Sequence, residues 1–162
     1  MGKRNKDEDI VECITELCCT ADIFIREYID GELLILNIPQ VTIEAFRSKS
    51  RKREIVKRRQ LAMYFCRRKT ALSLSQIGSK LSGHDHATVL HAIKEMQNLT
   101  QTDPKFRESF NKLEDRINFR MKKLQKKEPP ERNSLKNRLH EISAYTHIVN
   151  VRIALNELRN EL

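Results

Sequence analysis

Apolar and polar residues alternate with helical periodicity along most of this chain. Near the N-terminus the apolar positions recur at steps of four and three, which places them on one face of a helix or of two short consecutive helices: Ile10, Ile14, Leu17, Ala21, Phe24 and Tyr28. Gly31 is expected to interrupt or end this segment. A second apolar cluster, residues 33–38, runs into Pro39 and predicts a short helix or turn.

The middle of the chain predicts a brief helix followed by a long one. Thr42 is placed to cap the brief helix, with Ile43 and Phe46 pointing inward. After a basic loop, residues 53–69 read as a long helix. Its expected buried side is Ile55, Val56, Leu61 or Ala62, Phe65 and Cys66, and its expected solvent side is Lys57, Arg58, Arg67 and Arg68.

Two further helices with a tight turn between them follow. Ser73 and Gln76 have the spacing of a capping box, and Gly83 turns the chain. The next helix begins near Asp85; it is expected to bury Val89, Ile93 and Met96 and to expose Ala87, His91 and Lys94. This order predicts a helix-turn-helix, whose second helix can enter the major groove of DNA.

The last third of the chain predicts two more helical segments. After Pro104 an amphipathic helix carries the apolar stripe Phe106, Phe110, Leu113, Ile117 and Leu124. The segment from Glu131 has an irregular leucine-rich seam, which either folds back or pairs with a second copy. The predicted fold class is all-α, with an acidic amphipathic segment at 1–31, a helix-turn-helix domain at 32–126 and a helical extension at 127–162.

Charge changes this picture more than overall composition does. The net charge is +9, but residues 41–70 hold 11 basic and 2 acidic side chains, whereas residues 1–40 hold 4 and 9. The concentration of positive charge at residues 41–70 suits binding to a polyanion, with nucleic acid as the first candidate and an anionic membrane as the second. The plainer alternative is that these charges form an ordinary solvated surface. No apolar run approaches the roughly 20 residues of a membrane span, and the four cysteines have no CxxC spacing, so we expect a cytoplasmic protein with reduced thiols.

The histidines and the aspartate of the stretch "GHDHATVLHA" could belong to a metal site or a catalytic site. His84 and His86 lie two residues apart at a helix start and do not share a helical face, and no ligand follows at standard spacing, so no metal site is predicted. A His–Asp pair would need a nucleophile in a concave pocket, and Cys66 reads as core. The motif GxxxxGK[ST] is absent from the sequence. We therefore predict no enzyme activity, no cofactor and no bound nucleotide.

Residues 41–96 contain the stretches "KSRKREIV", "RQLAMYF", "SLSQIG" and "GHDHATVLHA" in this order. With them, this region resembles the C-terminal DNA-binding domain of the bacterial chromosomal replication initiator DnaA. It implies a helical domain that binds duplex DNA. By position it implies base contacts from Arg51 in the minor groove and from Ser75, Asp85, His86 and Ala87. It implies phosphate contacts from Lys49, Arg59, Gln60, Arg67 and Thr88, and Lys52, His84, His91 and Lys94 are additional candidates.

These roles fit the side chains. An arginine suits a narrow minor groove, an aspartate accepts from cytosine, and the alanine methyl meets that of thymine. For Asp85 a helix cap is an alternative that is compatible with base contact, for His91 a plain surface position, and for Arg59 a salt bridge to an N-terminal acid.

The sequence departs from the usual family pattern at three positions. His84 stands where arginine is usual, Ala87 where threonine is usual, and Ser75 where proline is usual. We expect a free-standing, sequence-specific DNA reader without the ATPase part, nucleoid-associated in a bacterium, that regulates replication or transcription or serves a mobile element. The alternative is an interaction module that regulates a replication protein. A homodimer through the C-terminal helix is a further expected partnership.

Overall fold

The structure is a computed structural model that describes residues 5–126. Of these, residues 5–125 belong to one compact unit. The predictions for the extension at 127–162, including dimerisation through it, lie outside the described residues. The elements, in chain order, are α1 (Lys6–Thr20), β1 (Ile23–Ile29), β2 (Glu32–Ile38), α2 (Ile43–Arg47), α3 (Arg53–Lys69), α4 (Leu74–Ser82), α5 (His86–Thr102) and α6 (Pro104–Lys126).

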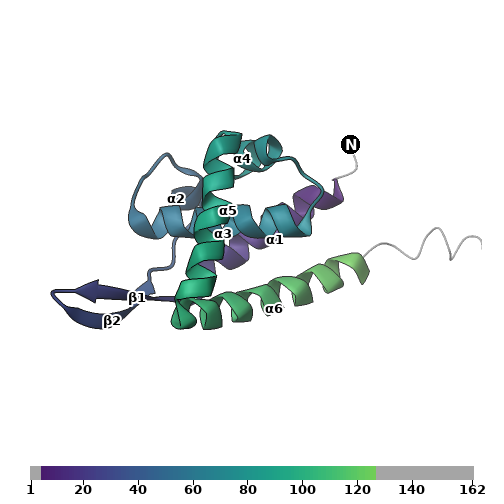
Figure 1. Ribbon diagram of the computed structural model, residues 1–162. Coiled ribbons are helices and arrows are strands. Elements are labelled where there is room, and N and C mark those ends of the chain that lie inside the picture. The colour runs from purple at the N-terminus through teal and green to yellow at the C-terminus, as the bar shows by residue number, and fades with distance from the viewer. Residues whose placement is uncertain (1–4, 127–162) are drawn as a thin grey trace, which may run out of the picture. The chain divides into compact units, whose positions relative to one another are not determined.

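The fold is mostly helical, and α3 is its central element. α3 packs against α1, α4 and α5, and α5 crosses it in Figure 1. Phe65 of α3 stacks on Phe110 of α6 with ring centroids 4.8 Å apart, and Tyr64 meets the same ring edge-on. These aromatic contacts attach the long α6 to the core.

The helical prediction is wrong for the segment between α1 and α2. Residues Ile23–Ile29 and Glu32–Ile38 form an antiparallel hairpin that projects from the helices (Figure 1). Its turn residues Asp30 and Gly31 have φ of 52° and 85°, and positive φ at both central positions is the requirement of a type I′ turn. The steps of four and three that reach Phe24 and Tyr28 are a coincidence of spacing, because β-branched residues around an Asp-Gly pair favour a hairpin.

Several predicted side-chain positions are confirmed and some are corrected. Thr42 caps α2 and Phe46 is buried, but Ile43 is 37% exposed. In α5 Ala92 is buried, and Ile93 is only partly so. Leu124 of α6 is exposed. The largest correction is Arg58, which was expected in solvent and is 0% exposed.

All four cysteines are buried and free. Burial raises the pKa of the Cys66 thiol to about 12. Between residues 5 and 126, no helix combines the length and the apolar character that crossing a membrane requires.

Candidate nucleic-acid interface

The two helices of the predicted helix-turn-helix are fixed by local capping. Ser73 Oγ accepts from the Gln76 main-chain N–H at 3.3 Å, and Gln76 Oε1 accepts from the Ser73 main-chain N–H at 2.9 Å. Gly83 closes α4 with a left-handed φ of 68°, a conformation that favours glycine. Asp85 Oδ1 accepts from the Thr88 N–H at 2.8 Å and caps α5. Hydrogen bonding from the Thr88 side chain, and secondly from its main-chain N–H, holds the pKa of Asp85 below its ordinary value, so the cap is ionised at neutral pH.

Gly78 of α4 sets the distance between the two helices. The Gly78 carbonyl accepts from the His84 N–H at 3.0 Å. A Cβ at position 78 would lie against the His84 carbonyl oxygen, 2.9 Å from its carbonyl carbon and 3.2 Å from Val89 Cγ2. Our sequence reasoning missed this residue, although a glycine inside a short helix is a signal of close approach.

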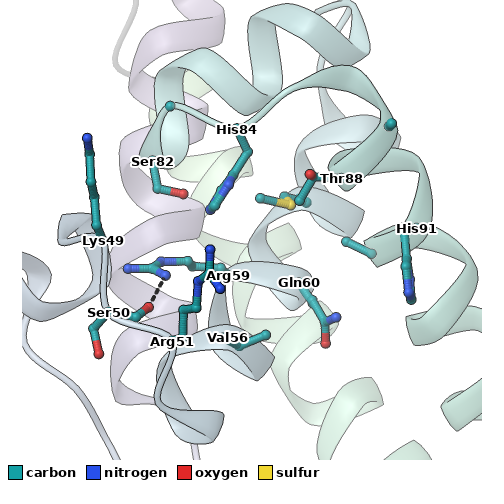
Figure 2. Close-up of a pocket in the computed structure, with 14 residues that line it drawn as sticks. Lys49, Ser50, Arg51, Val56, Arg59, Gln60, Ser82, His84, Thr88 and His91 are labelled. Atoms are coloured by element: carbon teal, nitrogen blue, oxygen red, sulfur yellow. Dashed lines mark hydrogen bonds between the residues drawn. The ribbon is translucent and has the colours of Figure 1, made fainter.

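The turn and α5 face the basic loop, residues 48–52, across a groove of about 600 Å³ (Figure 2). In the picture His84 points into the groove from the turn, and Arg51 points into it from the loop. The groove brings together many predicted contact residues from four segments: Lys49, Arg51, Arg59, Gln60, His84, Ala87, Thr88 and His91. Other groove residues were not predicted: Ser50, Val56, Met63, Ser82, Gly83 and Ala92.

The remaining predicted contact residues lie outside this groove. Asp85, His86 and Lys94 are exposed on or beside α5, and Lys94 lines a shallower depression with His91 and Asn98. Ser75 is exposed in the first turn of α4. Lys52 is the N-cap residue of α3. Arg67 is exposed near the other end of α3 and donates to the Leu72 carbonyl at 3.4 Å.

Arg59 has partners other than the predicted salt bridge. It is 4% exposed and donates to the main-chain carbonyls of Phe46 at 2.6 Å and Ser50 at 2.6 Å, and also to those of Ala45 and Ser48. Figure 2 shows the bond to Ser50. Burial lowers the pKa of this guanidinium. Arg59 therefore holds the basic loop that carries Arg51, and its predicted contact with phosphate stays a prediction.

His84 and Gln60 give the groove a polar lining. Burial, with a smaller effect from the positive charge of Arg59, lowers the pKa of His84, so its imidazole is neutral at pH 7. Within residues 5–126, Gln60 Oε1 and Ser82 Oγ are buried without a hydrogen-bond partner. Buried polar atoms of this kind are costly unless a ligand or water satisfies them.

Ion pairs separate the basic residues into two groups. Arg53 pairs with Glu27, Lys57 with Glu95, and Lys69 with Glu114. Among the residues that the structure describes, Lys49 and Arg51 at the groove form no ion pair. Their charges remain available to an anionic ligand.

The model of the family described as "Bacterial dnaA protein helix-turn-helix" matches residues 34–96. The chain is 44% identical over 80 residues to the chromosomal replication initiator protein DnaA of Flavobacterium psychrophilum, covering 49% of this chain and 17% of that protein. It is 41% identical over 73 residues to the DnaA of Wolbachia pipientis (45% and 16%), and 34% identical over 119 residues to that of Ehrlichia ruminantium (64% and 24%). The chain thus spans at most about a quarter of the length of these relatives.

Proposed function

We propose, from the premise that residues 34–96 form a helix-turn-helix domain of the DnaA C-terminal type, that this protein binds double-stranded DNA and prefers particular sequences. A domain of this type binds DNA and is not catalytic. In the proposal the exposed face of α5 enters the major groove, while Arg51 enters the adjacent minor groove.

The observation that carries the proposal is that two separate segments face one groove. Arg51 on the basic loop and the first turns of α5 lie on opposite sides of it (Figure 2). A recognition helix with an arginine beside it fits a duplex, because the major and minor grooves are adjacent along the DNA surface. The unpaired charges at Lys49 and Arg51 meet phosphates and the negative minor groove.

Individual roles follow from side-chain chemistry and position. Asp85, His86, Ala87 and Ser75 read base edges, and Lys49, Gln60, Arg67 and Thr88 bind phosphates. Lys52, His91 and Lys94 add further contacts, and neutral His84 adds hydrogen-bonding capacity without charge. Because Arg59 is already bonded to carbonyls, we assign it the task of holding the basic loop.

The proposed biological setting is a nucleoid-associated, cytoplasmic regulator of replication or transcription in a bacterium, or a protein of a mobile element. The alternative is an interaction module that uses the DnaA-like scaffold or its terminal helices to bind a replication protein, a use that the apolar stripe of the acidic N-terminal helix would suit. That stripe, with Ile14 and Leu17, is buried in the core beside α3. The apolar face of α1 is therefore buried within the domain, and the alternative would depend on the polar side of α1 or on the rest of the scaffold.

The first test is a selection of binding sites from random duplex DNA, followed by a salt titration of the selected site and a scrambled control. We expect a defined motif and a log–log salt slope of several units, at about 0.9 per phosphate contacted. Feeble binding with no motif at physiological salt would reject the proposal.

Four substitutions test the division of roles. Arg51→Ala and His86→Ala should each reduce the preference for the selected site by about 1–3 kcal/mol, because they read bases. Lys49→Ala and Arg67→Ala should weaken binding to all sequences alike, because phosphates carry no sequence information. Equal losses on selected and scrambled DNA for all four variants would show that these assignments are wrong.

A further inference from the structure

The two edges of the β-hairpin are treated differently by the rest of the molecule. At the β1 edge, the Phe24 N–H donates to Ser109 Oγ at 3.1 Å and the Arg26 N–H donates to Asp103 Oδ2 at 2.6 Å. Asp103 also accepts from two N–H groups at the start of α6. Asp103 at the α5–α6 junction and Ser109 of α6 therefore cap the β1 edge.

The β2 edge points its backbone away from the hairpin. In an antiparallel pair, two residues directly opposite each other either both point their backbone N–H and C=O groups toward the other strand or both point them away from it. Arg26 is opposite Ile35 and Phe24 is opposite Asn37. Since the N–H groups of Arg26 and Phe24 point outward from β1, those of Ile35 and Asn37 point outward from β2.

This outward edge carries exposed apolar side chains and lacks the usual protection. Ile35 is 57% exposed and Leu33 is 43% exposed. Proteins normally block open edges with lysine, proline or a bulge. Between residues 33 and 38 the chain has no charged residue and no proline.

We propose that the β2 edge pairs antiparallel with the β2 edge of a second copy, in the register that places Ile35 opposite the partner's Ile35. The result is a four-stranded sheet with strand order β1, β2, β2, β1 across a two-fold axis. This interface goes beyond the proposed function, and it does not depend on DNA binding.

Charge and hydrogen-bond direction both fit this occupant. In the proposed register Leu33 is opposite the partner's Asn37, and all of these residues direct their backbone groups outward. The only charged residue of β2 is Glu32, which lies six positions along the pair from the partner's Glu32, or about 20 Å. No like charges therefore face each other. The exposed Ile35 side chains of the two copies become cross-strand neighbours and can pack against each other.

The first experiment measures the mass of the full chain by light scattering and sedimentation over a range of micromolar concentrations, without DNA. We expect a dimer, and we expect Ile35→Lys to abolish it across the range, because it would place two ammonium groups in facing positions. Phe119→Lys is the matched control, since Phe119 is 60% exposed on α6, and should remain dimeric. A monomeric wild-type chain, or a dimeric Ile35→Lys variant, would overturn the proposal.

The second experiment tests the register. Ile35→Cys would place two thiols on directly opposite residues, about 5.5 Å apart between Cα atoms. Leu33→Cys would separate them by four residues along the pair, about 14 Å. A short thiol crosslinker that cannot bridge the longer distance should link the Ile35→Cys chains and leave the Leu33→Cys chains at the wild-type level. Equal crosslinking of both variants, or none of either, would overturn the register.

Discussion

Arg58 and Arg59 are neighbours on α3, yet they hold two different parts of the chain. Arg58 donates to the carbonyls of Cys18 and Ala21 at the end of α1, and to those of Ile38 and Pro39 where the hairpin returns. Arg59 binds the carbonyls of α2 and the basic loop. In each case a buried guanidinium donates to backbone carbonyls at the ends of regular elements and in the irregular chain beside them.

The difference between the two arginines lies in what they support. Arg58 joins the base of the hairpin to the core and does not line the groove, and burial lowers its pKa. Arg59 lies at the groove and fixes the loop that carries Arg51. Two adjacent residues of one type thus divide stability and recognition between them, which the following variants test.

We expect the largest effect from Arg58→Met. It would take a charged donor away from four main-chain carbonyls, and hydrogen bonds to charged groups contribute more to stability than neutral ones, so the free energy of unfolding should fall by about 3–5 kcal/mol. Urea denaturation measures this change. Arg67→Met, at an exposed position of the same helix, should change stability by less than about 0.5 kcal/mol. Similar losses in both variants would contradict the assignment.

Arg59→Met should affect recognition more than Arg58→Met does. Freeing the basic loop removes the placement of Arg51, so the preference for the selected site should fall by about 1–3 kcal/mol. The double variant with Arg51→Ala should lose no more preference than Arg51→Ala alone, because both changes act through one side chain. A salt slope reduced by about 0.9 would instead indicate a direct phosphate contact.

Gly78→Ala tests the recognition side without changing charge. The added methyl would force α4 and the His84 turn apart, at a cost of about 1–3 kcal/mol in the free energy of unfolding. Ser79→Ala, one residue away and exposed, is the control and should be close to neutral. Thermal unfolding of both variants decides the matter, and equal melting temperatures would show that the turn adapts.

His84 should give the smallest effect, visible as pH dependence. Its folded pKa is lowered by burial, so its neutral form is favoured in the folded state. Its contribution to stability is complete above the unfolded pKa of about 6.5 and declines as pH falls below it, toward the folded value. The free energy of unfolding can be measured between about pH 7.5 and pH 5.5, the range in which histidine titrates. It should fall less with decreasing pH in His84→Gln than in the wild-type chain. An equal decline in the variant and the wild-type chain would show that other groups cause the loss of stability at low pH.

The sequence alone determined the helix-turn-helix, because its signals are local. The capping box of Ser73 and Gln76, the turn at Gly83, the cap at Asp85 and the span of α3 each depend on residues within a few positions of one another. Most of the groove-lining residues of the loop and α5 were likewise predicted, through the resemblance of their motifs. The division of contact roles among them stays a prediction.

The tertiary structure decided what depends on distant segments. The hairpin carried an Asp-Gly turn signal, but residues 10–28 also fit a helical period, and the choice between the two periods is made by packing. The burial of Arg58 could not be read from a basic run, since its four carbonyl partners come from residues 18–39. The same holds for Arg59 and for the contact that requires glycine at position 78, because a sequence pattern does not record which backbone groups of other segments lie nearby.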